Sequence, residues 1–145
     1  MKRLLACAAA VLSIAMWTPT AANAAIELKL GHVCPATGDR LEQAAQVFKK
    51  YVEEKTGGEI VVKTFPASQL GGEREMLESI QMGTLECGTI TNAPFSNFLK
   101  ETLVFDIPFV FSKAEHAHRV LDGEFGQYLL GLVEKRMGVK ALVFG

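Results

Sequence analysis

Polar side chains stand at the ends of three strand-like runs in the sequence. His32 ends the first run, Glu73 follows the second after a loop with two glycines, and Thr91 and Asn92 end the third. In parallel α/β sheets, ligands bind outside the carboxyl ends of the strands, so these four residues are the candidate ligand-binding residues. Imidazole, carboxylate, hydroxyl and amide groups at one sheet edge can hydrogen-bond a small polar molecule.

Each of the four residues also has a simpler structural interpretation. Glu73 suits the first turn of a helix, because a carboxylate is stabilised at the positive end of the helix dipole. Its neighbour Arg74 is expected to be a surface or salt-bridging residue. His32 can be satisfied by loop backbone, and Thr91 and Asn92 can cap a turn. Spacing alone slightly favours this structural interpretation for Glu73.

The remaining reactive side chains form no catalytic or metal-binding pattern. His116 and His118 are two residues apart on an expected helix, so they point in different directions and cannot share a metal ion. The glycines fit neither a phosphate loop nor a dinucleotide fingerprint, and there is no nucleophile elbow. We therefore expect no enzyme, no cofactor and no metal site. Three aromatic residues are expected in the core over the sheet: Phe105, Phe109 and Phe111.

Three cysteines leave the redox state of the chain open. Cys7 falls in the leader segment described below, and Cys34 and Cys87 remain. An oxidising compartment would allow a disulfide between them. Their expected positions, at different heights on neighbouring strands, favour two free thiols.

Hydrophobic periodicity and turn residues predict a β-α-β-α-β order for residues 26–91. Asp39 and Glu42 form a capping-box pattern at the start of the first helix, and Gly57 and Gly58 end it. This order implies the α/β class, with parallel strands, right-handed crossovers and helices over the sheet. The expected elements are a strand at 26–33, a helix at 40–56, a strand at 59–65, a helix at 73–82 and a strand at 85–91.

The chain after residue 91 begins with an aromatic segment that contains Pro94 and Pro108. Because proline is excluded from central strands, this segment is expected to be an ordered connection over the sheet. Ser112 and Glu115 form a second capping-box pattern. The elements expected to follow are helices at 113–121 and 124–138 and a fourth strand at 139–145.

The N-terminus has the organisation of a cleavable secretory signal peptide. Lys2 and Arg3 precede an apolar run at residues 4–16, and an Ala-Asn-Ala sequence ends at Ala24. The apolar run is too short to cross a hydrocarbon core of roughly 30 Å. We therefore expect residues 1–24 to be removed, export to the periplasm, and one domain formed by residues 25–145.

The charge balance argues against a nucleic-acid partner. The chain carries 15 lysines and arginines against 16 aspartates and glutamates, and two of the basic residues lie in the leader. No basic cluster remains that could follow a phosphate backbone.

Four segments of the chain carry a family pattern. They are LKLGHV, the long run VEEKTGGEIVVKTFPASQLGGEREMLESIQMGTLE, FDIPFVF and AHRVLDGEFGQ. Together they resemble the solute-binding subunit of tripartite ATP-independent periplasmic (TRAP) transporters, the DctP-type family. The stretch FPASQLGGERE is the most specific, and the resemblance covers essentially all of the chain after the leader.

The resemblance implies a periplasmic-binding-protein-like fold of the class II type, in which two lobes close over a small organic anion. The chain would be the first lobe, with its parallel β-α-β-α-β core, and would lack the second lobe and a clamp arginine. The implied function is capture of a sugar acid or dicarboxylate, by a monomer, for delivery to membrane-embedded TRAP permease subunits. The resemblance also moves the interpretation of Glu73, and slightly that of His32, towards ligand contact.

Two other interpretations stay open, namely a truncated gene product that does not bind ligand and an exported sensor module. If the chain is a truncated gene product, it is expected to bind solute weakly or not at all. An exposed sheet edge beside the third strand would then favour aggregation.

Overall fold

Strand β1 (Ile26–Gly31) is the central strand in the computed structural model, which describes residues 24–144. It pairs in parallel with β2 (Ile60–Phe65) on one side and with β3 (Cys87–Gly88) on the other, giving the order β2-β1-β3. The parallel α/β core predicted from the sequence is confirmed. The predicted leader lies outside the described residues, apart from its last position.

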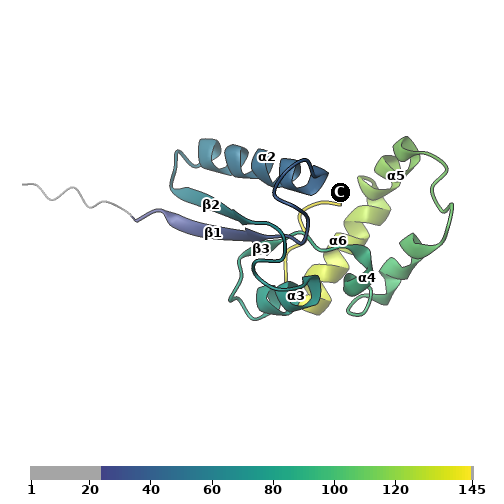
Figure 1. The fold of residues 1–145 in the computed structure, drawn as a ribbon. Coiled ribbons are helices and arrows are strands. Elements are labelled where there is room, and N and C mark those ends of the chain that lie inside the picture. Colours follow the sequence, from purple (N-terminus) through teal and green to yellow (C-terminus); the bar gives the residue numbers. More distant parts are fainter. Residues whose placement is uncertain (1–23, 145) are drawn as a thin grey trace, which may run out of the picture.

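Helix α2 (Arg40–Lys55) covers one face of the sheet (Figure 1). Asp39 is its N-cap, as predicted, and the Asp39 carboxylate accepts a hydrogen bond from the Leu41 N–H at 2.7 Å. The apolar face of the helix packs on the sheet and forms the first core. Its buried residues are Leu30, Ala45 and Val62, and Leu28, Phe48, Val52 and Cys87 pack partly buried around them.

Helix α3 (Glu73–Gln81) crosses the opposite side of the sheet near the end of β1 (Figure 1). A Cβ on Gly31 would lie 2.6 Å from the Met76 sulfur. Glycine at this strand position therefore lets the helix approach the sheet closely. Met76 and Leu77 are buried, as the periodicity predicts.

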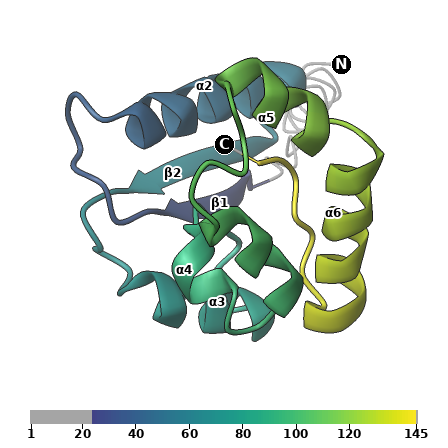
Figure 2. The same ribbon diagram turned by 90° about the vertical axis from the view of Figure 1, so that its right-hand side faces the viewer.

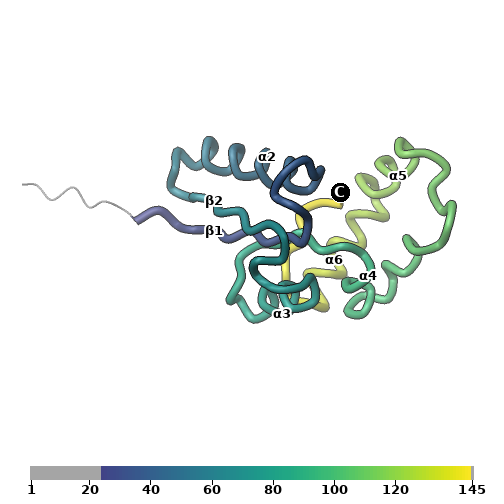
Figure 3. Tube along the Cα trace, in the orientation of Figure 1, coloured from purple at the N-terminus to yellow at the C-terminus, as the bar shows by residue number. Residues whose placement is uncertain are grey.

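Four helical elements make up the half of the molecule beside the sheet (Figure 2). They are α4 (Asn92–Phe95), the 3-10 helix η1 (Lys100–Asp106), α5 (Ala114–Leu121) and α6 (Glu124–Met137). Figure 3 shows the chain running out from β3 through η1 and α5 and returning along α6. The second core lies here, with Leu77, Leu99, Val133 and Met137 buried. Among residues 24–144, none of the helices combines the length and the apolar character that a bilayer span requires.

Two strand predictions differ from the structure. The third strand was expected at 85–91 but pairs only at Cys87 and Gly88. The fourth strand, predicted at 139–145, is wrong, because residues 139–144 have no regular secondary structure. A strand needs a neighbouring backbone to hydrogen-bond, and within residues 24–144 no strand of the sheet pairs with this segment.

Two local predictions in the second half are also wrong. Phe109 is 98% exposed and has a φ of 62°, whereas Phe105 and Phe111 stack with their ring centres 6.1 Å apart. The N-cap of α5 is Lys113 and not Ser112, so the predicted capping box does not form. The helix begins one residue later than predicted, which moves Glu115 out of the third helical position that a capping box requires.

Candidate functional site

The loops after β1 and β2 meet at the carboxyl ends of the strands. In the loop after β2, the Ala67 N–H donates to the Cys34 carbonyl at 2.8 Å and the Ser68 N–H donates to the His32 carbonyl at 3.1 Å. Two consecutive main-chain bonds therefore join one loop to the other. This is the edge at which parallel α/β sheets bind ligands.

Glu73 joins the second of these loops to the end of the third strand. Glu73 Oε1 accepts a hydrogen bond from the Thr91 N–H at 2.9 Å, and Oε2 accepts one from the Thr91 hydroxyl at 2.6 Å. We call this pair of bonds the Glu73–Thr91 clasp. It brings together two of the four predicted residues, and it places the Glu73 carboxylate in the first turn of α3, as expected.

Asn92 follows the clasp and begins α4. Its Nδ2 donates to the Thr102 carbonyl at 3.1 Å and to Asp106 Oδ1 at 2.7 Å. The amide group thus holds η1 against the start of α4. Because both amide hydrogens are used, the free group of Asn92 is its Oδ1 acceptor.

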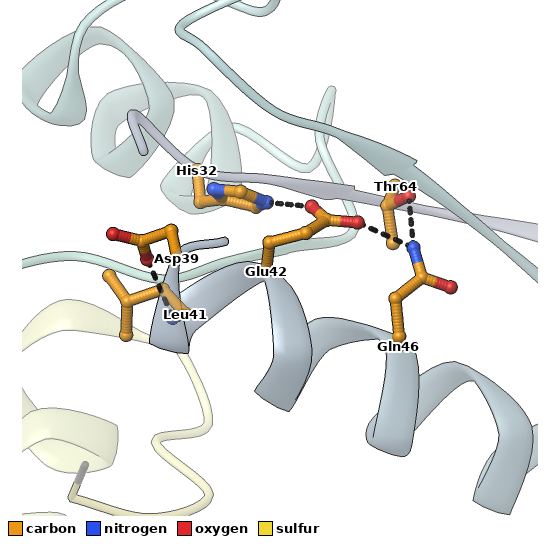
Figure 4. Close-up of polar contacts among 6 residues, drawn as sticks. All are labelled: His32, Asp39, Leu41, Glu42, Gln46 and Thr64. Atoms are coloured by element: carbon orange, nitrogen blue, oxygen red, sulfur yellow. Dashed lines mark hydrogen bonds and ion pairs between the residues drawn. The ribbon is translucent and has the colours of Figure 1, made fainter. Parts of the chain in front are cut away.

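His32 lies beneath the loops and not on their surface. Its side chain is 0% exposed, and Nε2 lies 2.7 Å from Glu42 Oε2 (Figure 4). The other Glu42 oxygen accepts from Gln46 Nε2 at 2.6 Å, and that nitrogen also lies 3.2 Å from Thr64 Oγ1. In this arrangement the imidazole links β1 to the first turn of α2, and ligand contact by His32 stays a prediction.

The contact between Glu42 and His32 also corrects the first capping-box prediction. That pattern has the Glu42 side chain accept the Asp39 N–H, but the carboxylate turns to His32 and Gln46. The N-cap half of the box, at Asp39, is confirmed.

Acid should weaken the fold through Glu42. Hydrogen bonds from Gln46 first, and then from His32, lower the pKa of the Glu42 carboxyl below its ordinary value of 4.5. A carboxyl with a lowered folded-state pKa stabilises the fold above its ordinary pKa, and this contribution is lost as the pH falls through the lowered value. We expect Glu42→Gln to flatten the acid limb of the stability curve, measured by urea unfolding at a series of pH values. The matched control is Glu59→Gln, a change at an exposed position that should leave the acid limb unchanged. An unchanged acid limb in Glu42→Gln would contradict the prediction.

The other reactive residues lie as the sequence indicates. Cys34 and Cys87 are free thiols, as predicted. Burial is the main cause that raises the pKa of both, and the Asp39 carboxylate adds to the shift at Cys34. Arg74 pairs with Glu78 at 3.0 Å on the surface of α3. Within the described part of the chain, no group of three or more His, Cys, Asp or Glu side chains is arranged to hold a metal ion.

Two hollows of the described chain lie away from the four predicted residues. A hollow of about 180 Å³ lies along α3, and another of about 310 Å³ lies between α6 and the segment after it. None of the four predicted residues lines either of these two hollows. The first hollow is lined by Lys29, Leu70, Ser79, Thr84 and Leu85.

Sequence reasoning missed two partners of the predicted residues. Glu42 lies 10 positions from His32, and Asp106 lies 14 positions from Asn92. Only the spacing of Glu42 and Gln46, four residues apart on one helix face, gave a local sign of the first network. The contact with Asp106 depends on how η1 folds back, which no local pattern encodes.

The fold defines the general class: an α/β protein with a parallel sheet, whose loops meet at the carboxyl ends of the strands. The family model described as DctP, bacterial extracellular solute-binding protein, family 7, matches residues 30–145. The chain belongs to this family, as the resemblance predicts.

Individual relatives agree with the family model. A solute-binding protein of Verminephrobacter eiseniae is 44% identical over 70% of this chain and 30% of its own length. A TRAP periplasmic solute-binding protein from Polaromonas sp. JS666, bound to D-erythronate, is 40% identical, with a TM-score of 0.73 over 77% of this chain and 36% of that one. A counterpart from Sulfurospirillum deleyianum with bound succinate is 34% identical, with a TM-score of 0.71 over 77% and 36%. The chain thus spans about a third of the length of the relatives that it matches.

Proposed function

We propose that the protein is the extracytoplasmic solute-binding component of a TRAP transporter and captures a small organic acid. The observation that carries this proposal is the Glu73–Thr91 clasp, which fixes a carboxylate and a hydroxyl where three loops meet at the carboxyl ends of the strands. The relatives with bound erythronate and succinate support the substrate class. Glu73, Thr91 and Asn92 are the proposed ligand contacts. His32 is the fourth predicted contact, and its imidazole links the end of β1 to Glu42 of α2.

We propose that the protein delivers its ligand to a membrane partner and catalyses no reaction. The bound acid passes to membrane-embedded TRAP permease subunits, and the protein works as a monomer without a cofactor. No catalytic function is proposed, because the family consists of solute-binding proteins. Capture takes place in the periplasm after cleavage behind Ala24, and N-terminal sequencing of the protein from a periplasmic fraction tests that step.

Calorimetric titration of the mature gene product tests the proposed function. The panel consists of aldonates, uronates and C4-dicarboxylates, with neutral sugars of the same size as controls. We expect micromolar or tighter binding of at least one acid and none of the neutral sugars. Absence of binding across the acids would overturn the proposal and favour the non-binding or sensor interpretation.

A further inference from the structure

Glu73 at the start of α3, and Thr91 and Asn92 after β3, offer hydrogen-bond acceptors to a ligand. The Thr91 hydroxyl gives its single hydrogen to Glu73, and Asn92 gives both amide hydrogens to Thr102 and Asp106. The groups left for a ligand are the carboxylate of Glu73, Oγ1 of Thr91 and Oδ1 of Asn92, and all of them accept hydrogen bonds.

These acceptor oxygens can accept further hydrogen bonds, and a ligand can reach them from solvent. Each oxygen of the Glu73 carboxylate takes one bond from Thr91, and a carboxylate oxygen has room for a second. Thr91 is exposed, and Glu73 and Asn92 are half-buried. The clasp holds the carboxylate from two directions, so its free lone pairs keep a fixed orientation.

Neighbouring groups do not turn this place into an anion site. The Arg74 guanidinium pairs with Glu78 at 3.0 Å, and its side chain is 72% exposed. The positive end of α3 already has two carboxylates, because Glu73 and Glu75 lie in its first turn. Glu75 Oε2 accepts the Gly72 N–H at 2.9 Å. A ligand carboxylate placed here would meet acceptors and like charge.

We infer that the surface formed by Glu73, Thr91 and Asn92 receives the hydroxyl-bearing end of a polyhydroxylated monocarboxylate, a sugar acid. The same surface disfavours the binding of dicarboxylates. The inference rests on the proposed function and narrows its substrate class. Hydroxyl groups donate to Glu73, Thr91 and Asn92, and the single carboxylate of the ligand lies away from them. A site whose buried or fixed polar groups match ligand hydroxyls rejects analogues that lack those hydroxyls.

D-Erythronate and succinate form a matched pair of probes. Both are four-carbon acids; erythronate has one carboxylate and a hydroxyl on each of its other carbons, whereas succinate has two carboxylates and no hydroxyl. In calorimetric titrations of the mature gene product, we expect erythronate to bind at least about 100-fold more tightly than succinate. This preference should arise at Glu73.

The variant Glu73→Gln tests the cause of the preference. Glutamine replaces a carboxylate acceptor with an amide donor, so erythronate should bind about tenfold more weakly. Because the negative charge is also removed, succinate should gain affinity. Glu115→Gln, an exposed change on α5, should leave the ratio of the two affinities unchanged. Thermal melting of both variants separates a loss of folding from a change in selectivity.

The outcomes distinguish the inference from the proposed function. Succinate binding as tight as erythronate, or an unchanged ratio in Glu73→Gln, would overturn the inference and leave a solute-binding protein. A ligand that donates from an ammonium group and outcompetes erythronate would also overturn it. Failure to bind any organic acid would overturn the proposed function, and the inference with it.

Discussion

Replacing Gly126 with alanine is expected to lower the free energy of unfolding by about 3 kcal/mol or more, the upper range for an added atom in a packed core. Gly126 is buried in the first turn of α6, and a Cβ there would lie 1.7 Å from the carbonyl oxygen of Leu121. The obstructing atom belongs to the backbone of α5, so no change of rotamer relieves the clash. The two helices would have to separate.

Gly131, in the same helix, is the matched control. Apart from its chain neighbours and the backbone of its own helix, no atom lies within 4 Å of the Cβ that an alanine would add there. We expect Gly131→Ala to raise the free energy of unfolding by about 0.5–1 kcal/mol, because glycine disfavours a helix interior. Urea unfolding of both variants measures the difference. Equal stability of Gly126→Ala and the unchanged protein would show that α5 and α6 do not pack as described.

Replacing His32 with alanine is expected to cost about 3 kcal/mol, from the lost charge-assisted hydrogen bond and the cavity left behind. The His32 side chain is fully buried, and its Nε2 atom holds the Glu42 carboxylate at 2.7 Å. The link between β1 and α2 is lost with the imidazole. Thermal and urea unfolding measure the change, and His118→Ala, at an exposed position of α5, should change stability little.

The same variant separates the two interpretations of His32. If the imidazole acts as a structural link, His32→Ala lowers stability, and ligand binding weakens only as the loops loosen. If affinity falls sharply while stability is unchanged, the imidazole contacts ligand directly, and the structural interpretation is wrong.

The core of the fold could be predicted from the sequence because each element carries its own local pattern. The periodicity and turn residues of β1, α2, β2, α3 and α6 place these elements within one residue, apart from the end of β1, which comes two residues earlier than predicted. Asp39 caps α2 as its side-chain chemistry indicates. These features depend on neighbours a few residues away in the chain.

The predictions that failed depend on distant partners. The run 139–144 has the composition of a strand, but composition does not supply the adjacent backbone that a strand requires. Phe109 has the hydrophobicity of a core residue, and only the path of the chain between η1 and α5 shows that it lies at the surface. In the site, the sequence indicated Glu73 and Thr91, but the clasp spans 18 positions and could not be predicted from spacing.

The backbone of the loop after β2 has a consequence for binding. Ala67 and Ser68 have φ values of 51° and 60°, a conformation that costs about 1–2 kcal/mol for each non-glycine residue. Their N–H groups donate to the Cys34 and His32 carbonyls, and these two bonds hold the loop in this conformation. This side of the site is therefore preorganised, and a solute that docks against it loses little affinity to the entropy of ordering the loop.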